Sequence, residues 1–481
     1  MIETLEAWQT VLRWKSENPP SDQESDQQSS ALLATADCQL PRDPALAIIL
    51  TAAAMELIFH RSRTAEVDES PLVSDTARHL AALRSSHTWT RLGDESRPRP
   101  GAAKVRGRRV SPGKLRLLVM PGAYGQFHQD VVNAVGGFAS IQVAKTLSFR
   151  DFTKRRPSSS DLLLLDAMRQ GRVDLAEQTI DGEPVDDPLL ARYVAALAHL
   201  AKLLRRRDVV LGDWGDAATM WASHLRPKGT RYVTRLHSLD LLDPWIHLID
   251  WRGVDAVAVA NPSMGSLFTQ LVGDRTKSKR PQVVQPYRPD LSEEPAPKTA
   301  GASGNLGMVG WGRKVKHVDF ALDLLERDPA RRLVLIGPGF DVNSDRDACT
   351  YQAQVQHRIA TLGDRVQVVG QTSDVRSHLA DIGFIISSST REGWHLGLIE
   401  GAASGSVPIV RDWPLLDTHG GAAQFYPAEW VVNDVAEADK RIREVVESGW
   451  EQASGLAREQ ALAHFDHSAT RDRLLQVVMR R

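Results

Sequence analysis

The sequence predicts an α/β protein with two domains, each built on a parallel sheet, preceded by a helical extension. Three observations support this prediction. The chain has 481 residues, whereas single hydrophobic cores usually stop growing near ~250–300 residues. From Leu115 onward, short apolar runs alternate with helical patterns, as in βαβ units. Polar residues follow several of these runs, at the edge where parallel sheets bind their ligands.

The composition narrows the classes of function. The net charge of −1 gives no overall attraction to nucleic acid. Cys38 and Cys349 are far apart and lack ligand spacing, which argues against a disulfide framework or a zinc site and favours a reducing compartment. The acidic N-terminus is unlike a secretory signal, and the apolar window 45–59 is shorter than the ~20 residues that span a bilayer. We therefore expect a cytoplasmic protein without a nucleic-acid partner.

Residues 1–110 are predicted to form a helical extension that ends in a basic linker. Helices are expected near residues 5–14, 44–61 and 75–83, and the polar stretch 17–30 is predicted to be a solvated loop. Between Arg97 and Lys114 there are seven basic residues and no acidic one. We interpret this segment as a solvated linker. The alternative is a peripheral contact with anionic lipid or a charged acceptor, which would place the protein at the cytoplasmic side of a membrane.

The first α/β domain is predicted over residues 111–290. Its first strand, 115–120, leads into a loop containing Gly122, Tyr124 and Gly125, where glycine lets the backbone approach a ligand. A second strand is expected at 141–144. Helices are expected at 161–170 and from Asp187-Pro188, a helix cap followed by proline. Three further strands run into polar segments, which are Asp213-Trp-Gly-Asp216, His237-Ser-Leu-Asp240 and Asn261-Pro-Ser-Met.

The second α/β domain is predicted over residues 300–465, after a linker from Arg288 that is rich in Pro, Gly and Ser. A basic turn containing Arg313 and Lys316 lies between its first strand and the helix 318–326. Further strands are expected at 331–336 and 364–370. A C-terminal helix is expected over 466–481, where it can pack back on the first domain.

The most informative stretch is a strand–turn–helix–strand unit at 383–410. An apolar run at 383–386 enters a polar turn, and the helix that follows has Leu396, Ile399 and Ala403 on one face. Such a helix points its N-terminus into the crevice of the sheet, where anions are held. Glu392 precedes the first turn of the helix and Glu400 lies on its second. Both carboxylates are therefore expected to reach a ligand whose phosphates cap the helix.

Together, Glu392-x7-Glu400 and the turn Gly312-Arg313 to Lys316-His317 resemble the motifs of retaining glycosyltransferases of the GT-B fold, family 4. The likeness covers about residues 115–481; the turn is short, and His317 stands where that family has glycine. The resemblance implies two facing Rossmann-like domains with the active site between them. It implies a nucleotide-sugar-dependent hexosyltransferase acting in glycan, polysaccharide or glycoconjugate synthesis. The nucleotide sugar would be a co-substrate, and neither a cofactor nor a metal is expected.

The resemblance also assigns roles to individual residues. Glu392 and His237 would contact the transferred sugar, and Glu400 would accept hydrogen bonds from the ribose, because a carboxylate can receive both hydroxyls of a vicinal diol. Arg313 and Lys316 would stabilise the charge that grows on the departing diphosphate. The predicted donor-binding residues are Arg313, Lys316, Gly393, Trp394, His395, Leu396 and Glu400; Trp394, His395 and Leu396 would bind through their backbone amides. The acceptor-side candidates are Gly122, Tyr124, Gly125, Asp213 and Asp216.

Other interpretations stay open. Enzymes of the same fold include sugar-nucleotide epimerases and phosphorylases, and the body could serve a non-catalytic binding protein. Asp216 could simply cap the helix that follows it. The sequence leaves the donor base, the sugar and the acceptor undetermined; the acceptor could be a lipid-linked sugar, a polysaccharide, a small metabolite or a protein.

Overall fold

The computed structural model describes residues 21–60, 69–93, 115–122, 125–144, 156–276, 280–340 and 346–479. The helix predicted near residues 5–14, the basic segment 97–114 and Tyr124 lie outside these ranges.

The first α/β domain is a six-stranded sheet in the order β2-β1-β6-β7-β8-β9, with every pairing parallel. All five residues of β6 are buried, as expected of a sheet covered by helices on both faces. The strands are β1 (Leu115–Pro121), β2 (Ala139–Val143), β6 (Val209–Asp213), β7 (Arg231–Leu236), β8 (Ala256–Val259) and β9 (Gln282–Val283). The main helices are α8 (Gln129–Val135), α10 (Ser159–Arg169), α11 (Pro188–Leu204), α12 (Ala217–Leu225) and α13 (Pro262–Val272).

The second domain has a six-stranded parallel sheet in the order β12-β11-β10-β13-β14-β15. Its strands are β10 (Asn305–Val309), β11 (Arg332–Ile336), β12 (Val366–Gly370), β13 (Phe384–Ser387), β14 (Val407–Arg411) and β15 (Val431–Val432). Its helices are α14 (Val318–Glu326), α15 (Arg346–Leu362), α16 (Val375–Leu379), α17 (Leu396–Ala403), α18 (Val435–Ser448) and α19 (Trp450–His464). A small antiparallel sheet, which the sequence analysis did not anticipate, consists of β3 (Val173–Asp174), β4 (Thr179–Ile180) and β5 (Glu183–Pro184).

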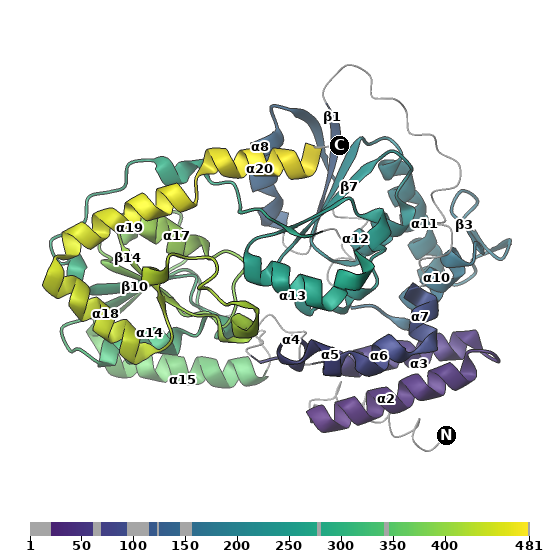
Figure 1. Ribbon diagram of the computed structural model, residues 1–481, viewed down its shortest axis with the longest axis horizontal. Coiled ribbons are helices and arrows are strands. Elements are labelled where there is room, and N and C mark those ends of the chain that lie inside the picture. The colour runs from purple at the N-terminus through teal and green to yellow at the C-terminus, as the bar shows by residue number, and fades with distance from the viewer. Residues whose placement is uncertain are drawn as a thin grey trace.

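The C-terminal helix α20 (His467–Met479) returns to the first domain, where it lies beside α8 (Figure 1). Leu474, Val477 and Val478 belong to the same apolar cluster as strands β1, β6, β7 and β8. The guanidinium of Arg231 donates a 2.8 Å hydrogen bond to the carbonyl oxygen of Val477. The chain thus crosses between the domains twice.

The prediction of a solvated loop over residues 17–30 is wrong from Ser21 onward. Ser21 caps a helix there, α2 (Asp22–Gln39). Ser21 and Glu24 form a capping box, in which the Ser21 hydroxyl accepts from the Glu24 amide and the Glu24 carboxylate accepts from the Ser21 amide. The small side chains of Ser25 and Ser29 are buried. They allow a polar sequence to pack closely against α3 (Pro44–Ile58).

The rest of the helical extension consists of short helices that touch both domains. The helix predicted at 75–83 is interrupted at Leu80. Arg84 donates hydrogen bonds to the carbonyl oxygens of Gln270 (3.1 Å) and Leu271 (3.0 Å) at the end of α13. Helix α4 contacts the 3-10 segment η12 (Pro414–His419) of the second domain, and Figure 1 shows the extension running alongside α13. The short helices are α4 (Pro71–Ser74), α5 (Thr76–His79), α6 (Ala81–Ser85) and α7 (His87–Gly93).

No helix in the described ranges is both long enough and apolar enough to cross a membrane.

Candidate active site

The strand order places the predicted site residues at the switch point of each sheet. Ligands of open parallel sheets bind where the strand order reverses, outside the carboxyl ends of the strands. In the second sheet the reversal lies between β10 and β13, whose loops carry Lys316 and Glu392. In the first sheet it lies between β1 and β6, which end beside Gly122 and Trp214. A cleft between the two edges would therefore receive ligand-binding groups from both domains.

Glu392 is held by a cation from the neighbouring loop. The Lys316 ammonium donates to Glu392 Oε1, and the Ser389 hydroxyl donates to the same oxygen at 2.6 Å. The side chains of Lys316 and Glu392 are only 16% and 12% exposed. Burial alone would raise the pKa of Glu392, but Lys316 and the Ser389 hydrogen bond lower it to about 2. The carboxylate is therefore ionised at neutral pH.

The basic turn is held by Ser388, the residue directly after strand β13, which pairs with β10. The Ser388 hydroxyl hydrogen-bonds the carbonyl oxygens of Lys316 and His317, both at 2.9 Å. Arg313 is exposed at the start of this turn, before the 3-10 segment η10 (Lys314–Lys316). A side chain at Gly312 would come within 2.4 Å of the Pro338 carbonyl oxygen, so only glycine lets the turn approach the next loop.

His395 supports the start of α17 with its side chain buried. Its Nε2 lies 3.0 Å from the carbonyl oxygen of Val309 and its Nδ1 lies 2.7 Å from the Ser387 hydroxyl. Because a carbonyl only accepts, Nε2 donates and Nδ1 accepts, which is the neutral tautomer. Burial lowers the pKa of His395 to about 4. The two ring nitrogens of His395 are thus engaged within the second domain, by β10 and β13.

The N-terminus of α17 is packed directly against β10. A side chain at Gly397 would lie 2.4 Å from Val309 Cβ, so this helix can approach the strand only because residue 397 is glycine. Trp394, just before the helix, points back and packs edge-on against Phe465 at 5.9 Å. Helix α17 begins at Leu396, and the Leu398 amide donates to the His395 carbonyl oxygen at 3.1 Å. The amides that come before it, those of Leu396 and Gly397, belong to the first turn, whose N–H groups find no partner one turn back in the helix. They supply a positive end for an anion.

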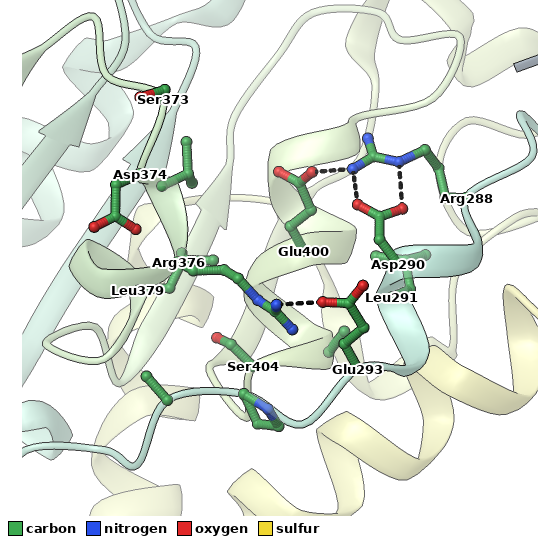
Figure 2. Close-up of a pocket in the computed structure, with 14 residues that line it drawn as sticks. Arg288, Asp290, Leu291, Glu293, Ser373, Asp374, Arg376, Leu379, Glu400 and Ser404 are labelled. Atoms are coloured by element: carbon green, nitrogen blue, oxygen red, sulfur yellow. Dashed lines mark hydrogen bonds and ion pairs between the residues drawn. The ribbon is translucent and has the colours of Figure 1, made fainter. Parts of the chain in front are cut away.

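Glu400 has a cation that the sequence analysis missed. Arg288 donates to Glu400 Oε1 at 2.7 Å, and it also binds Asp290 through two hydrogen bonds of 2.6 and 2.9 Å (Figure 2). Burial raises the pKa of Glu400, and Arg288 opposes that rise only in part. The group lies beside a pocket of about 290 Å³ between α17, the linker and the loop that begins α16. Arg288 lies in the segment that was predicted to be an interdomain linker.

On the side of the first domain, the candidate site is centred on His237. Its ring stacks on Trp214, with centroids 4.1 Å apart, and meets Phe127 at 5.2 Å. Nε2 lies 3.2 Å from Asp213 Oδ1. The imidazole therefore has a fixed plane and a carboxylate behind it.

The two aspartates predicted for the acceptor side are both buried. Asp213 receives hydrogen bonds of 2.6 and 3.0 Å from Arg235. Burial alone would raise its pKa, but Arg235 and His237 hold the pKa below the ordinary value. Asp216 caps α12 through a 3.1 Å hydrogen bond from the Thr219 amide, which is the structural role left open by the sequence. Burial raises the pKa of Asp216 to about 7.

The glycine loop lies beside the same ring system. A side chain at Gly122 would come within 2.3 Å of Trp214, so the loop and the indole pack closely. Gly125 opens the 3-10 segment η2 (Gly125–His128), which carries Phe127. The Phe127 ring is 45% exposed, and its carbonyl oxygen accepts from Arg235. An apolar ring is thus presented next to His237.

Direct hydrogen bonds join the two domains at the turn before α17. Asn261 donates to the carbonyl oxygens of Glu392 (3.0 Å) and Gly393 (2.8 Å), while its own Oδ1 caps α13. Arg391 donates to the Ser238 hydroxyl at 2.7 Å, next to His237. The structure therefore brings Lys316, Glu392 and the His237 segment together, with Glu400 on the second turn of α17. Asn261 was visible in the sequence only as a polar strand end before a proline.

Within the described ranges, no group of three His, Cys, Asp or Glu residues is arranged to hold a metal ion.

No protein-family model matches the sequence, and no curated protein matches it. Solved structures resemble the fold at low sequence identity. HepE of Anabaena in complex with UDP-glucose aligns at 15% identity and a TM-score of 0.52, covering 75% of this chain and 98% of HepE. Sucrose-phosphate synthase from Thermosynechococcus elongatus aligns at 15% identity and a TM-score of 0.53, covering 76% and 98%. A glycosyltransferase from Rickettsia africae aligns at 12% identity and a TM-score of 0.50, covering 77% of this chain and 100% of that enzyme. The predicted fold, GT-B with two Rossmann-like domains and a helical extension, is confirmed.

Proposed function

We propose that this chain is a retaining glycosyltransferase that moves a hexosyl group from a nucleotide sugar to an acceptor hydroxyl, in the synthesis of a glycan, polysaccharide or glycoconjugate. The observation that carries the proposal is the Lys316–Glu392 pair at the N-terminus of α17, with Glu400 on the next turn of the same helix. Structures of HepE hold UDP with glucose, or UDP-glucose. A nucleoside diphosphate sugar has a matching order of groups, which are sugar, diphosphate and ribose.

In this proposal the diphosphate lies at the first turn of α17. Lys316 exchanges its contact with Glu392 for one with the phosphates, and exposed Arg313 closes on them from the same turn. Glu392, which loses one hydrogen-bond donor in that exchange, accepts hydroxyl groups of the transferred sugar. Glu400 accepts from the ribose hydroxyls. The Lys316–Glu392 contact thus keeps both charges in place until a donor with complementary groups replaces it.

The transfer step follows from these positions. The bond from the anomeric carbon to the phosphate oxygen breaks, and the acceptor oxygen bonds to that carbon on the same face. The acceptor proton passes to the departing phosphate, so the scheme needs no enzymic nucleophile. Lys316, Arg313 and the α17 N-terminus stabilise the charge that grows on the diphosphate, which is a contribution made mainly in the transition state. His237 supports the reacting carbon from the opposite wall, with Asp213 fixing its orientation.

Three variants test the proposal directly. Glu392→Ala and Lys316→Ala should each depress transfer, and Glu400→Ala should chiefly weaken nucleotide binding. Wild-type transfer in all three would rule the assignment out. A panel of UDP-, GDP- and ADP-sugars, scored for binding and slow hydrolysis, would identify the donor. Conversion of the donor without an acceptor or hydrolysis would indicate an epimerase instead, and failure to bind any nucleotide would indicate a non-catalytic relative.

A further inference from the structure

The segment between the domains is docked on the second domain along much of its length. Glu293 pairs with Arg376 at 2.5 Å, and Glu294 pairs with Arg458 at 3.0 Å. The Lys298 ammonium donates to the carbonyl oxygens of Leu379 (2.8 Å) and Ile382 (2.7 Å). The segment is therefore a fixed wall of the pocket beside Glu400. It begins with Arg288, immediately before the 3-10 segment η8 (Pro289–Ser292).

Arg288 contacts one oxygen of Glu400 and leaves the other available. The guanidinium Nη2 donates both to Glu400 Oε1 at 2.7 Å and to Asp290 Oδ2 at 2.6 Å. Within the described residues Glu400 Oε2 makes no hydrogen bond, and Figure 2 shows it directed away from Arg288, toward the side of the pocket where Ser373 and Asp374 lie. One oxygen of the Glu400 carboxylate is thus held by Arg288, and the other faces the pocket.

The charges around Glu400 make this contact necessary. Its side chain is 24% exposed, and burial together with the nearby Asp290 disfavours its ionised form. Asp374, Glu293 and Arg376 line the same pocket, and Arg376 is engaged by Glu293. Arg288 is the group that opposes the effect of burial on Glu400.

We propose that Arg288 is a positioning residue of the donor site, which holds the Glu400 carboxylate so that its second oxygen meets the ribose diol of a nucleoside diphosphate sugar. The inference rests on the proposed function, and it adds that the nucleotide site is incomplete without the interdomain linker. Two other roles for Arg288 predict different results. If ribose displaces Arg288, removing the arginine should tighten binding. If Arg288 only joins the linker to the domain, its removal should lower the melting temperature and leave nucleotide affinity unchanged.

The test compares R288M, R288K, E400Q and the control R458M in the full chain. Arg458 anchors the same linker through Glu294 but lies outside the pocket that contains Glu400. Calorimetric titration with UDP, GDP and ADP gives Kd for each protein, and the matching nucleotide sugar gives KM and kcat. We expect R288M to weaken binding of the preferred nucleotide about 10- to 100-fold, the effect of losing a charge-assisted hydrogen bond. R288K, which keeps the charge but not the planar fork, should fall between. R458M should bind within about twofold of wild type.

The pH dependence adds a readout that a purely structural role would not move. Loss of Arg288 should shift the pH midpoint of nucleotide affinity upward, because burial and Asp290, which remain, disfavour the ionised form of Glu400. E400Q should lack this pH-dependent component, both alone and in the double variant R288M/E400Q.

The outcomes separate the inference from the proposed function. If the wild type binds none of the three nucleotides, the proposed function fails. If the wild type binds and E400Q weakens binding, but R288M matches the wild type or binds more tightly, the inference about Arg288 alone is overturned. Should R288M not fold, R288K decides the matter, since unchanged affinity and an unchanged pH midpoint in R288K would overturn the inference as well.

Discussion

Glu392 lies in the turn before α17 and Glu400 on the second turn of that helix, and each is paired with a cation, yet their surroundings differ in kind. Glu392 takes its partner, Lys316, from the neighbouring loop of the same sheet. Glu400 takes Arg288 from the interdomain linker and shares it with Asp290. The pKa of Glu392 is lowered to about 2, whereas the pKa of Glu400 is raised. The proposed sugar end of the site therefore takes its cation from the domain's own fold, and the proposed ribose end depends on a second part of the chain.

This difference predicts that damage at the sugar end affects the chemical step most. Lys316→Met should lower kcat about 10²- to 10³-fold, the range found when one preorganised transition-state contact is removed. Glu400→Gln should leave kcat within a few-fold of the wild type. Steady-state kinetics with the preferred donor measures both. A kcat loss of the same size in Glu400→Gln would break the distinction between the two ends.

The second prediction concerns stability. Lys316→Met leaves the buried Glu392 carboxylate without its cation, so the free energy of unfolding should fall by about 3 kcal/mol. In the double variant Lys316→Met/Glu392→Gln most of that loss should be recovered, while transfer stays impaired. Denaturant titration of the three proteins provides the values. No recovery in the double variant would mean that Lys316 stabilises the turn through other contacts.

The third prediction concerns the ribose end. Glu400→Gln should raise the donor KM and the nucleotide Kd about 10- to 100-fold, because a charged acceptor for two hydroxyl donors is lost. The adjacent carboxylate Asp374 is the matched comparison, since it caps α16 by accepting from the Ser377 amide and hydroxyl. Asp374→Asn should change binding less than Glu400→Gln does. Equal effects would place the ribose elsewhere in the pocket.

The two glutamates should also have opposite effects on pH-dependent stability. The folded pKa of Glu392 lies below its unfolded value, so its stabilising contribution is present above about pH 4.5 and is lost as the pH falls toward 2. The folded pKa of Glu400 lies above its unfolded value, so its contribution is present below the unfolded pKa and is lost as the pH rises through the folded one. Thermal unfolding should be followed from pH 3 to 8. Glu392→Gln should reduce the loss of stability that the wild type shows as the pH falls, and Glu400→Gln should remove a small loss of stability that the wild type shows as the pH rises. Parallel curves for the two variants would contradict this.

The smallest expected effect is at Asn261, which fixes the backbone of the sugar end. Asn261→Asp keeps an oxygen to cap α13 but removes both donors to the carbonyls of Glu392 and Gly393. We expect transfer to fall several-fold, because each of the two lost hydrogen bonds contributes about 1 kcal/mol and the new carboxyl group faces the two carbonyl oxygens. Asn433→Asp, at an exposed residue just before α18, is a control away from α13 and the turn before α17. An unchanged kcat would show that the turn is positioned without Asn261.

The sequence could predict those parts of the molecule that depend on local patterns. Apolar runs located the main strands of both sheets, Asp187-Pro188 marked the start of α11, and the spacing around Glu392 placed Glu400 on the second turn of α17. The same local reasoning fails at α2. The polar composition of residues 17–30 favours a loop, whereas the Ser21–Glu24 capping box starts a helix. Arg288 escaped notice for a different reason. It is 112 residues from Glu400, and a long-range ion pair leaves no periodic signal in a sequence.

The roles of the site residues, the retaining stereochemistry and the membrane contact of residues 97–114 stay predictions. Residues 97–114 and Tyr124 lie outside the described ranges.

The most direct test of the account is nuclear magnetic resonance of the sugar released when the full chain is incubated with UDP-, GDP- and ADP-glucose and, in parallel, with each nucleotide sugar plus candidate acceptors. We predict that one nucleotide sugar is bound and consumed, that the product first formed has the same anomeric configuration as the donor, and that Lys316→Met slows the reaction about 10²- to 10³-fold. Inversion at the anomeric carbon, or consumption of none of the three donors together with no binding of any nucleoside diphosphate, would contradict it.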